Sequence, residues 1–165
     1  MQIEFINCNE SHIDTIQQLA NKIWRKHYPS IITIEQIDYM LNKMYSGKSL
    51  MQQMNQGHQF TILSINNFAT GFIAVSQKEE HHYFINKLYV DTTQHRKGLG
   101  KMLLNKIEQE YTNAETFSLT VNRQNFNAIN FYFKNGFVIE SVADFDIGNG
   151  YVMNDFVMKK KLSLR

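Results

Sequence analysis

A short segment that follows a predicted strand combines two glycines with three cationic side chains at the start of a predicted helix. The glycines are Gly98 and Gly100, and the cations are Arg96, Lys97 and Lys101. A helix start presents backbone N–H groups without an intrahelical partner and carries partial positive charge, so it attracts anions. Glycines let a phosphate approach these amides, and the cations add charge beside them. The pattern therefore predicts a diphosphate site.

Two better-known phosphate loops do not match this segment. A Walker loop needs a glycine five positions before its Gly-Lys pair and a hydroxyl after it, but here His95 and Met102 occupy those places. A dinucleotide fingerprint needs a third glycine three positions after the second, where this chain has Leu103. The remaining alternative is a surface turn that holds these residues without binding a ligand.

A second segment, residues 117–137, carries further residues at regular spacing. The first segment resembles the Q/R-x-x-G-x-G/A pyrophosphate loop of the GCN5-related N-acetyltransferase (GNAT) superfamily. The second resembles that superfamily's V-N-x-x-N-x-x-A-x-x-x-Y-x-x-x-G-F segment. Together they resemble its acetyl-CoA-binding core, and the likeness spans nearly the whole chain. The positions that match the second pattern are Val121, Asn122, Asn125, Ala128, Tyr132, Gly136 and Phe137.

The resemblance implies one α/β (α+β) domain over residues 1–165. Its sheet is expected to be mixed but mostly antiparallel, with about seven strands flanked by helices. A parallel strand–helix–strand unit inside it would form the core that binds coenzyme A. A crossover of this kind is right-handed in nearly all proteins.

The same resemblance implies an N-acetyltransferase that moves an acetyl group from acetyl-CoA to a primary amine. The acceptor is left open between a small molecule, such as a polyamine, amino acid or aminoglycoside, and a peptide N-terminus. Two alternatives differ in class. One is a non-catalytic, regulatory module that binds acyl-CoA, and the other is a nucleotide-phosphate binder unrelated to coenzyme A.

Site residues follow from the resemblance position by position. The Tyr132 hydroxyl would protonate the leaving thiolate, and a backbone N–H near Leu88 would bind the oxyanion. Residues 88–90 would pair with the pantetheine arm like an added strand, and Asn125 would bond either pantetheine or the start of its helix. The residues expected to bind the cofactor are Leu88, Tyr89, Val90, His95, Arg96, Lys97, Gly98, Leu99, Gly100, Lys101, Asn125, Ala128 and Tyr132.

Three positions depart from the family pattern. His95 stands where Gln or Arg is usual, and Arg96 stands where many members have glycine. Many members also carry a glutamate on the strand before the loop, but residues 85–88 read Ile-Asn-Lys-Leu. The general base is therefore left open, with a water chain to solvent as the expectation. His27, Tyr28 or Asp146 are candidates to complete that chain.

The segment that joins the first two helices forms a wall of the acceptor cleft in the superfamily. Here that wall would be aromatic and methionine-rich, although ordinary core packing is the alternative for Trp24 and Met40. A polycationic acceptor would also need carboxylates in the cleft. The residues expected at the wall are Trp24, Tyr28, Tyr39 and Met40, and the candidate carboxylates are Glu35, Asp38, Asp144 and Asp146.

Composition limits the class of protein. The chain has 165 residues, 43% of them hydrophobic and 19% charged, which is typical of one globular domain. A net charge of +2 gives no reason to expect nucleic acid. The single cysteine, Cys8, cannot form an internal disulfide and favours a cytoplasmic protein.

The sequence also bears on whether a membrane, a metal ion or a second copy of the chain is a partner. No apolar run reaches the roughly 18 residues of a membrane span. The Glu and His pairs at 79–82 lack regular ligand spacing, so a solvated turn is preferred there to a metal site. A homodimer is left open.

Periodicity and turn residues predict the order of the elements. Ser11 is expected to cap the first helix, Thr33 the second, and Gly47 and Gly57 bracket a third. The Asn66-Asn67 pair suits a tight hairpin because asparagine tolerates positive φ. Later helices are expected at 99–111 and from Asn125. The predicted strands are 2–7, 59–65, 68–77, 83–90, 116–121, 137–142 and 151–160, with a turn at 144–150 before the last.

Overall fold

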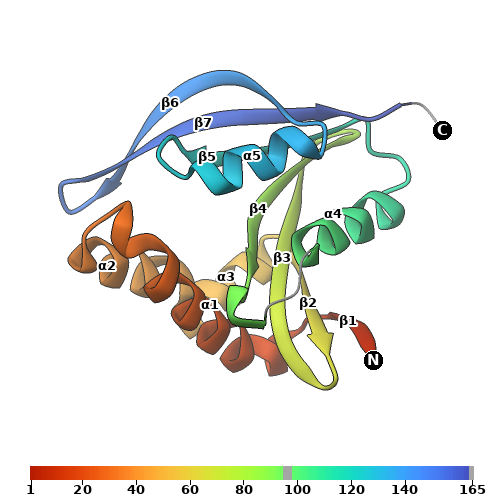
Figure 1. Ribbon diagram of the computed structural model, residues 1–165, viewed down its shortest axis with the longest axis horizontal. Helices are drawn as coiled ribbons and strands as arrows, with labels where there is room; N and C mark the ends of the chain where they lie inside the picture. The colour runs from red at the N-terminus through yellow and green to blue at the C-terminus, as the bar shows by residue number, and fades with distance from the viewer. Residues whose placement is uncertain (95–97, 164–165) are drawn as a thin grey trace.

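The computed structural model describes residues 1–94 and 98–163. One seven-stranded sheet runs through it in the order β1-β2-β3-β4-β5-β7-β6 (Figure 1). The β4–β5 pair is parallel and the other five pairs are antiparallel, so the expected mixed sheet is confirmed. The strands are β1 (Ile3–Asn7), β2 (Gln59–Ile65), β3 (Phe68–Glu79), β4 (His82–Val90), β5 (Thr116–Asn122), β6 (Val138–Gly148) and β7 (Tyr151–Lys161).

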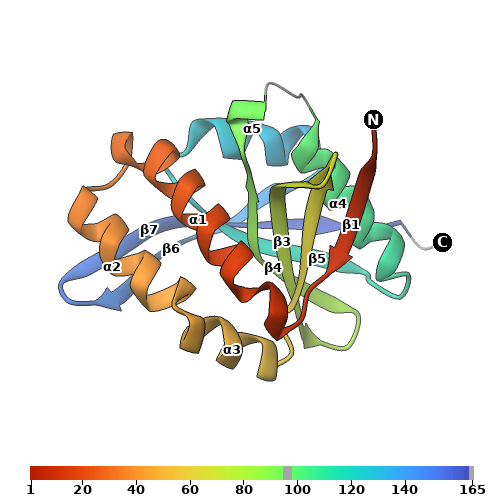
Figure 2. The ribbon, with the colours of Figure 1, turned by 90° about the horizontal axis from the view of Figure 1, so that it is seen from below.

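Helices cover both faces of the sheet and divide the core in two. Figure 2 shows α1 crossing β3 and β4 on one face, where it packs beside α2 and α3 around Trp24 and Phe72. The other face is covered by α4 and α5, which pack around Leu103 and Tyr132. The helices are α1 (Ile13–His27), α2 (Ile34–Tyr45), α3 (Gly47–Asn55), α4 (Leu99–Glu110) and α5 (Phe126–Lys134).

Helix starts agree with the sequence in one case and correct it in another. The Thr33 side chain caps α2 by accepting the Gln36 amide at 3.2 Å, as expected. Ser11 is not the cap at the first helical segment. Asn9 fills that role, because its side chain accepts the Ser11 amide at 2.9 Å. A short 3-10 turn, η1 (Glu10–His12), then leads into α1.

The two tight hairpins use residues with positive φ. Asn66 and Asn67 have φ of 50° and 67° and join β2 to β3, as predicted. The predicted turn at 144–150 is wrong, because β6 continues to Gly148 and only Asn149 and Gly150 form the turn. A register shift in the pairing with β7 falls next to Gly148 and keeps the two strands paired beyond the expected end.

The strand that leads to the cleft contains a bulge. β3 pairs Ala74 with Lys87 and Val75 with Ile85, which leaves Asn86 as the extra residue. A bulge reverses the alternation of side chains along a strand. Ile85 and Leu88 therefore pack on the side of α4, although they are three residues apart. By the same reversal, Lys87 reaches the opposite face, over the Tyr45 ring.

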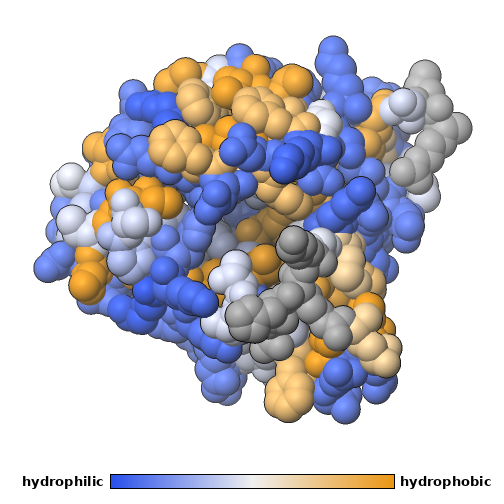
Figure 3. Space-filling model, in the orientation of Figure 1, coloured by the Kyte–Doolittle hydropathy of each residue, from blue (hydrophilic) through white to orange (hydrophobic). Residues whose placement is uncertain are grey.

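Apolar side chains also gather on the outer surface. Figure 3 shows hydrophobic residues over the β6–β7 hairpin, where Val138, Val142 and Val152 are exposed. β6 lies at the end of the sheet order, so this surface borders a sheet edge. Within the described ranges, no helix has the length and apolar character needed to span a membrane.

Candidate active site

β4 and β5 separate in the middle of the sheet and open a cleft. Their parallel pairing stops at Phe84 and Ser118, although both strands continue. The cleft that lies there has a volume of about 1350 Å³. Its walls come from the later part of β4, the end of β5, the start of α4, α5, the α1–α2 region and the β6–β7 hairpin. A strand pair that splits leaves backbone amides and carbonyls free to bind an extended ligand.

The start of α4 lies at one end of the cleft and has the features of an anion site. Gly98 has φ of +90°, and a Cβ atom at this position would meet nothing within 4 Å. No side chain among the described residues caps this helix. Gly98 and the first residues of α4, Leu99 to Lys101, line the cleft. The predicted ligands His95, Arg96 and Lys97 lie outside the described residues.

Gly100 lies where α4 and α5 approach each other closely. A Cβ atom there would lie 2.9 Å from Cζ of Phe131, a side chain of α5 that also lines the cleft. The glycine therefore allows α4 and α5 to approach each other beside the anion site. Access of a phosphate to the α4 amides, the role expected for both glycines, remains a prediction.

Tyr132 lies on the cleft wall formed by α5. It is only 8% exposed and packs against the Phe131 and Phe137 rings at centroid distances of 5.2 and 5.5 Å. Burial, with a smaller contribution from Tyr28, raises the pKa of Tyr132 well above its usual range. The hydroxyl therefore stays protonated at neutral pH and can act only as a proton or hydrogen-bond donor to an anion such as a thiolate.

Asn125 starts α5 and connects two walls of the cleft. Its Oδ1 accepts the Ala128 amide at 3.3 Å and so caps the helix, which is one of the two roles expected from the sequence. The same oxygen lies 3.2 Å from His27 Nε2 at the end of α1. Asn125, Ala128 and His27 all line the cleft.

β4 presents one edge to the cleft beyond its last pairing with β5. Leu88, Tyr89 and Val90, the residues expected to pair with the pantetheine arm, line the cleft there. The Tyr89 hydroxyl lies 3.3 Å from that of Tyr28, which follows the end of α1. Burial is the main cause that raises the pKa of Tyr28 to about 12 and that of Tyr89 well above its usual range, so both groups remain neutral hydroxyls at pH 7.

Comparison with known proteins identifies this arrangement. A family model described as an acetyltransferase (GNAT) domain matches residues 30–156. The chain belongs to the GNAT acetyltransferase family. It is therefore an N-acetyltransferase that depends on acetyl-CoA.

Individual relatives of this acetyltransferase agree with the family. A spermidine N(1)-acetyltransferase of Thermoplasma acidophilum is 28% identical over 98% of each chain. The crystal structure of the PaiA N-acetyltransferase of the same organism with coenzyme A is 26% identical, with a TM-score of 0.83 over 98% of this chain and 100% of that one. The crystal structure of the ribosomal-protein-S18-alanine N-acetyltransferase of Escherichia coli shares the fold. It is 16% identical, with a TM-score of 0.74 over 99% of this chain and 96% of that one.

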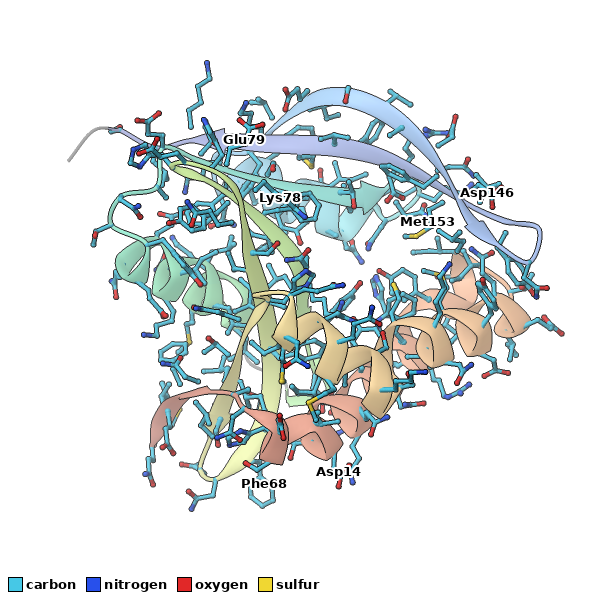
Figure 4. All side chains as sticks on the ribbon, turned by 180° about the vertical axis from the view of Figure 1, so that it is seen from behind. Asp14, Phe68, Lys78, Glu79, Asp146 and Met153 are labelled. Atoms are coloured by element: carbon cyan, nitrogen blue, oxygen red, sulfur yellow. The ribbon has the colours of Figure 1, made fainter. Side chains whose placement is uncertain are left out.

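The wall of the cleft that was expected to face the acceptor is aromatic and methionine-rich. Trp24, Tyr28 and Met40 line the cleft as expected, and the first and last are also buried core residues. Tyr39 does not line it, because its hydroxyl donates to the Ile147 carbonyl at 2.7 Å and fastens the β6–β7 hairpin to α2. Figure 4 shows Met153 on the side of this hairpin that is turned toward the helices.

The four carboxylates expected in the cleft do not line it. Asp38 is paired with Arg25 at 2.7 Å and Asp144 with Arg123 at 2.8 Å, while Asp146 accepts the backbone amide of Gly148. Two arginines and a turn amide therefore hold Asp38, Asp144 and Asp146 outside the cleft lining. The carboxylates that do line the described cleft are Asp91 and Asp155.

Sequence reasoning missed Asp155. It lies in the middle of β7, opposite Asn122 of β5, and is 1% exposed. Aspartate is uncommon inside strands, and this was the signal that could have found it. The other missed feature is Lys87, which is 8% exposed, with its Nζ 5.0 Å from the centroid of the Tyr45 ring. Burial lowers the pKa of Lys87 to about 8.

Proposed function

We propose that this protein transfers the acetyl group of acetyl-CoA to a primary amine of a small molecule, by direct attack while both substrates are bound. The observation that supports it most is the split between β4 and β5, because it opens onto the α4 start at one end and places Tyr132 on its wall. The relative that acts on spermidine supports an amine acceptor.

The residues present fit coenzyme A at the donor side. The diphosphate would lie against the α4 amides, where Gly98 leaves open space and no described side chain takes the place of an anion. The pantetheine arm would follow the free edge of β4 at residues 88–90. Ala128 and Asn125 would border it from α5. Acetyl-CoA supplies the acetyl group as a thioester.

Two groups of this chain would act on the reacting atoms. The Leu88 backbone N–H would donate a hydrogen bond to the carbonyl oxygen as negative charge develops on it, a contribution that is typically worth about 3–4 kcal/mol. The Tyr132 hydroxyl would donate its proton to the thiolate as the C–S bond breaks. Burial raises the pKa of this hydroxyl, so it stays protonated until the thiolate forms beside it.

Release of free thiol from acetyl-CoA with a panel of primary amines tests this function. Tyr132→Phe is expected to lower kcat about 100-fold and to leave the affinity for coenzyme A unchanged. Tyr111→Phe is the matched control, because Tyr111 is not among the residues that line the cleft. Tight binding of coenzyme A without turnover of any amine would instead favour the regulatory module.

A further inference from the structure

Asp155 is a buried carboxylate in the cleft without a matching cation. It is 1% exposed, and its Oδ1 has no hydrogen-bond partner among the described residues. Burying a carboxylate without neutralising it is costly, so such groups are uncommon outside functional sites. The aspartate also lines the cleft, where an incoming ligand could supply the missing partner.

The neighbouring cation does not neutralise this carboxylate. Arg123 donates to Asp144 Oδ1 at 2.8 Å and to the backbone carbonyl of Asp155 at 3.4 Å, not to its side chain. The groups that affect its titration are Thr120 on β5, Arg123 after it and Asp144 on β6. Burial is the largest of these influences and raises the pKa of Asp155 to about 6, although Thr120 and Arg123 oppose it.

Asp155 shares the cleft with Tyr28 and Tyr132. The charge of Asp155 contributes to the raised pKa of Tyr28, and Tyr28 contributes in turn to that of Tyr132. The rings of Trp24 and Tyr89 lie 4.3 and 6.4 Å from that of Tyr28. Trp24, Tyr28 and Tyr89 line the same cleft as Asp155, so the cleft offers an ammonium group aromatic faces, which also attract cations.

The rest of the acceptor side favours one cationic centre rather than several. Asp91, the other carboxylate of the described cleft, is already paired with Lys22 at 2.5 Å. Lys26 and the buried Lys87 also line the cleft and would repel a second ammonium. The remaining wall is mostly apolar and includes Ile32, Met40, Met44, Phe145, Ile147 and Met153, with Gln36 as a polar residue among them.

We propose that Asp155 is the acceptor site of the transfer: its carboxylate binds the ammonium of a primary amine that has an apolar body, and takes one proton from it. This rests on the proposed function. The neutral nitrogen then forms the N–C bond with its lone pair as the C–S bond breaks. Tyr132 gives its proton to the thiolate and regains one from the acylated nitrogen. Asp155 releases the first proton to solvent.

The decisive comparison is between Asp155→Asn and Asp38→Asn, assayed by thiol release with 2-phenylethylamine and with spermidine. Asp38 carries the same substitution at an exposed ion pair outside the cleft. Asp155→Asn is expected to lower kcat/KM for 2-phenylethylamine at least 100-fold, with the Kd for coenzyme A within twofold of wild type. For Asp38→Asn, both kcat/KM for 2-phenylethylamine and the Kd for coenzyme A are expected to stay within twofold of wild type.

The pH profile and the preference of the wild type complete the test. The kcat/KM of the wild type for the amine, which reports the free enzyme, should rise between about pH 5 and 7, and this limb should be absent in Asp155→Asn. The wild type should prefer 2-phenylethylamine to spermidine at least tenfold, a measurement that does not depend on the variant folding.

Several outcomes would overturn the assignment. Activity of Asp155→Asn within threefold of wild type would remove Asp155 from the acceptor site, and a parallel loss of coenzyme A affinity would make its role structural. A tenfold preference for spermidine would reject the apolar, singly charged acceptor. A wild type that binds coenzyme A but acetylates no amine would reject the proposed function itself, and this inference with it.

Discussion

His27 Nε2 lies 3.2 Å from Asn125 Oδ1, which joins the end of α1 to the start of α5 across the cleft. The Ala128 amide donates to the same oxygen, so this atom of Asn125 acts as an acceptor. His27 must therefore carry a hydrogen on Nε2 and donate it. Through this contact, the residue that starts α5 also holds the histidine at the wall of the cleft.

Substitution of Asn125 separates its two contacts. Asn125→Ala is expected to lower the free energy of unfolding by about 1 kcal/mol, because α5 loses its cap. Asn125→Ser should retain most of that stability, since serine is also a good cap, but its side chain is too short to reach His27. Thermal unfolding measures the first contact. If the His27 contact positions the acceptor, both variants should raise KM for the amine, and a normal KM in Asn125→Ser would contradict that role.

The contact between Gly100 and Phe131 predicts a coupling between two helices. Gly100→Ala is expected to cost about 1–3 kcal/mol of stability, because its Cβ would crowd the Phe131 ring. The cost should fall by more than half in a Phe131→Leu background. Gly98→Ala is the control, because its cost of about 1–3 kcal/mol arises from a φ of +90° and should be the same in either background. A double-mutant cycle by denaturant unfolding measures both couplings, and a Gly100 coupling near zero would reject the close approach.

Local chemistry explains what the sequence predicted and what it did not. Asn66 and Asn67 form the expected hairpin because a turn depends on its own residues. Asn149 and Gly150 carry an equally strong turn signal, but the polar residues before them hid the continuation of β6. Tyr132 was placed at the cleft by a spaced motif, which carries long-range information that propensities lack.

The direction in which the cleft carboxylates point could not be predicted, because it depends on pairing between distant strands. Whether Asp155 faces inward is set by the register of β7 against β5 and β6, with register shifts in the β6 pairing. Asp144 and Asp38 are withdrawn to the rim by arginines that no local pattern links to them. The role of Gly100 likewise depends on a helix that begins 26 residues later.

Lys87 should make the free energy of unfolding depend on pH in the alkaline range, between about pH 8 and 10.5. Burial lowers its folded-state pKa from 10.5 to about 8, so the charged form is disfavoured in the folded protein. Stability from this group is present above the unfolded pKa and is lost as pH falls from about 10.5 through 8. Lys87→Met, which conserves much of the side-chain volume, is therefore expected to add about 1–3 kcal/mol at pH 7 and less at pH 9.5.

The control for Lys87 is a lysine outside the cleft. Figure 4 shows Lys78 beside Glu79 at the end of β3, near the turn into β4, and its side chain is exposed. Lys78→Met should change stability by less than about 0.5 kcal/mol at both pH values. Equal gains for the two variants, or a gain for Lys87→Met that does not shrink with rising pH, would show that Lys87 is not held in an unfavourable charged state.

The contribution of Asp155 to stability should change with pH in the opposite direction to that of Lys87, because it is lost as pH rises. Its folded-state pKa of about 6 lies above the ordinary 3.8, so protonation favours the folded protein. That stability is fully present below about pH 4 and is lost as pH rises through 6. Asp155→Asn has no charge to lose, so its stability relative to wild type should grow by about 1–3 kcal/mol between pH 4 and 7. Denaturant unfolding at both pH values measures this change.

A gain in the stability of Asp155→Asn would mean that the carboxylate is kept at a cost to the fold, as expected of a group that binds substrate. A loss of stability at pH 7 would mean instead that the carboxylate stabilises the native structure.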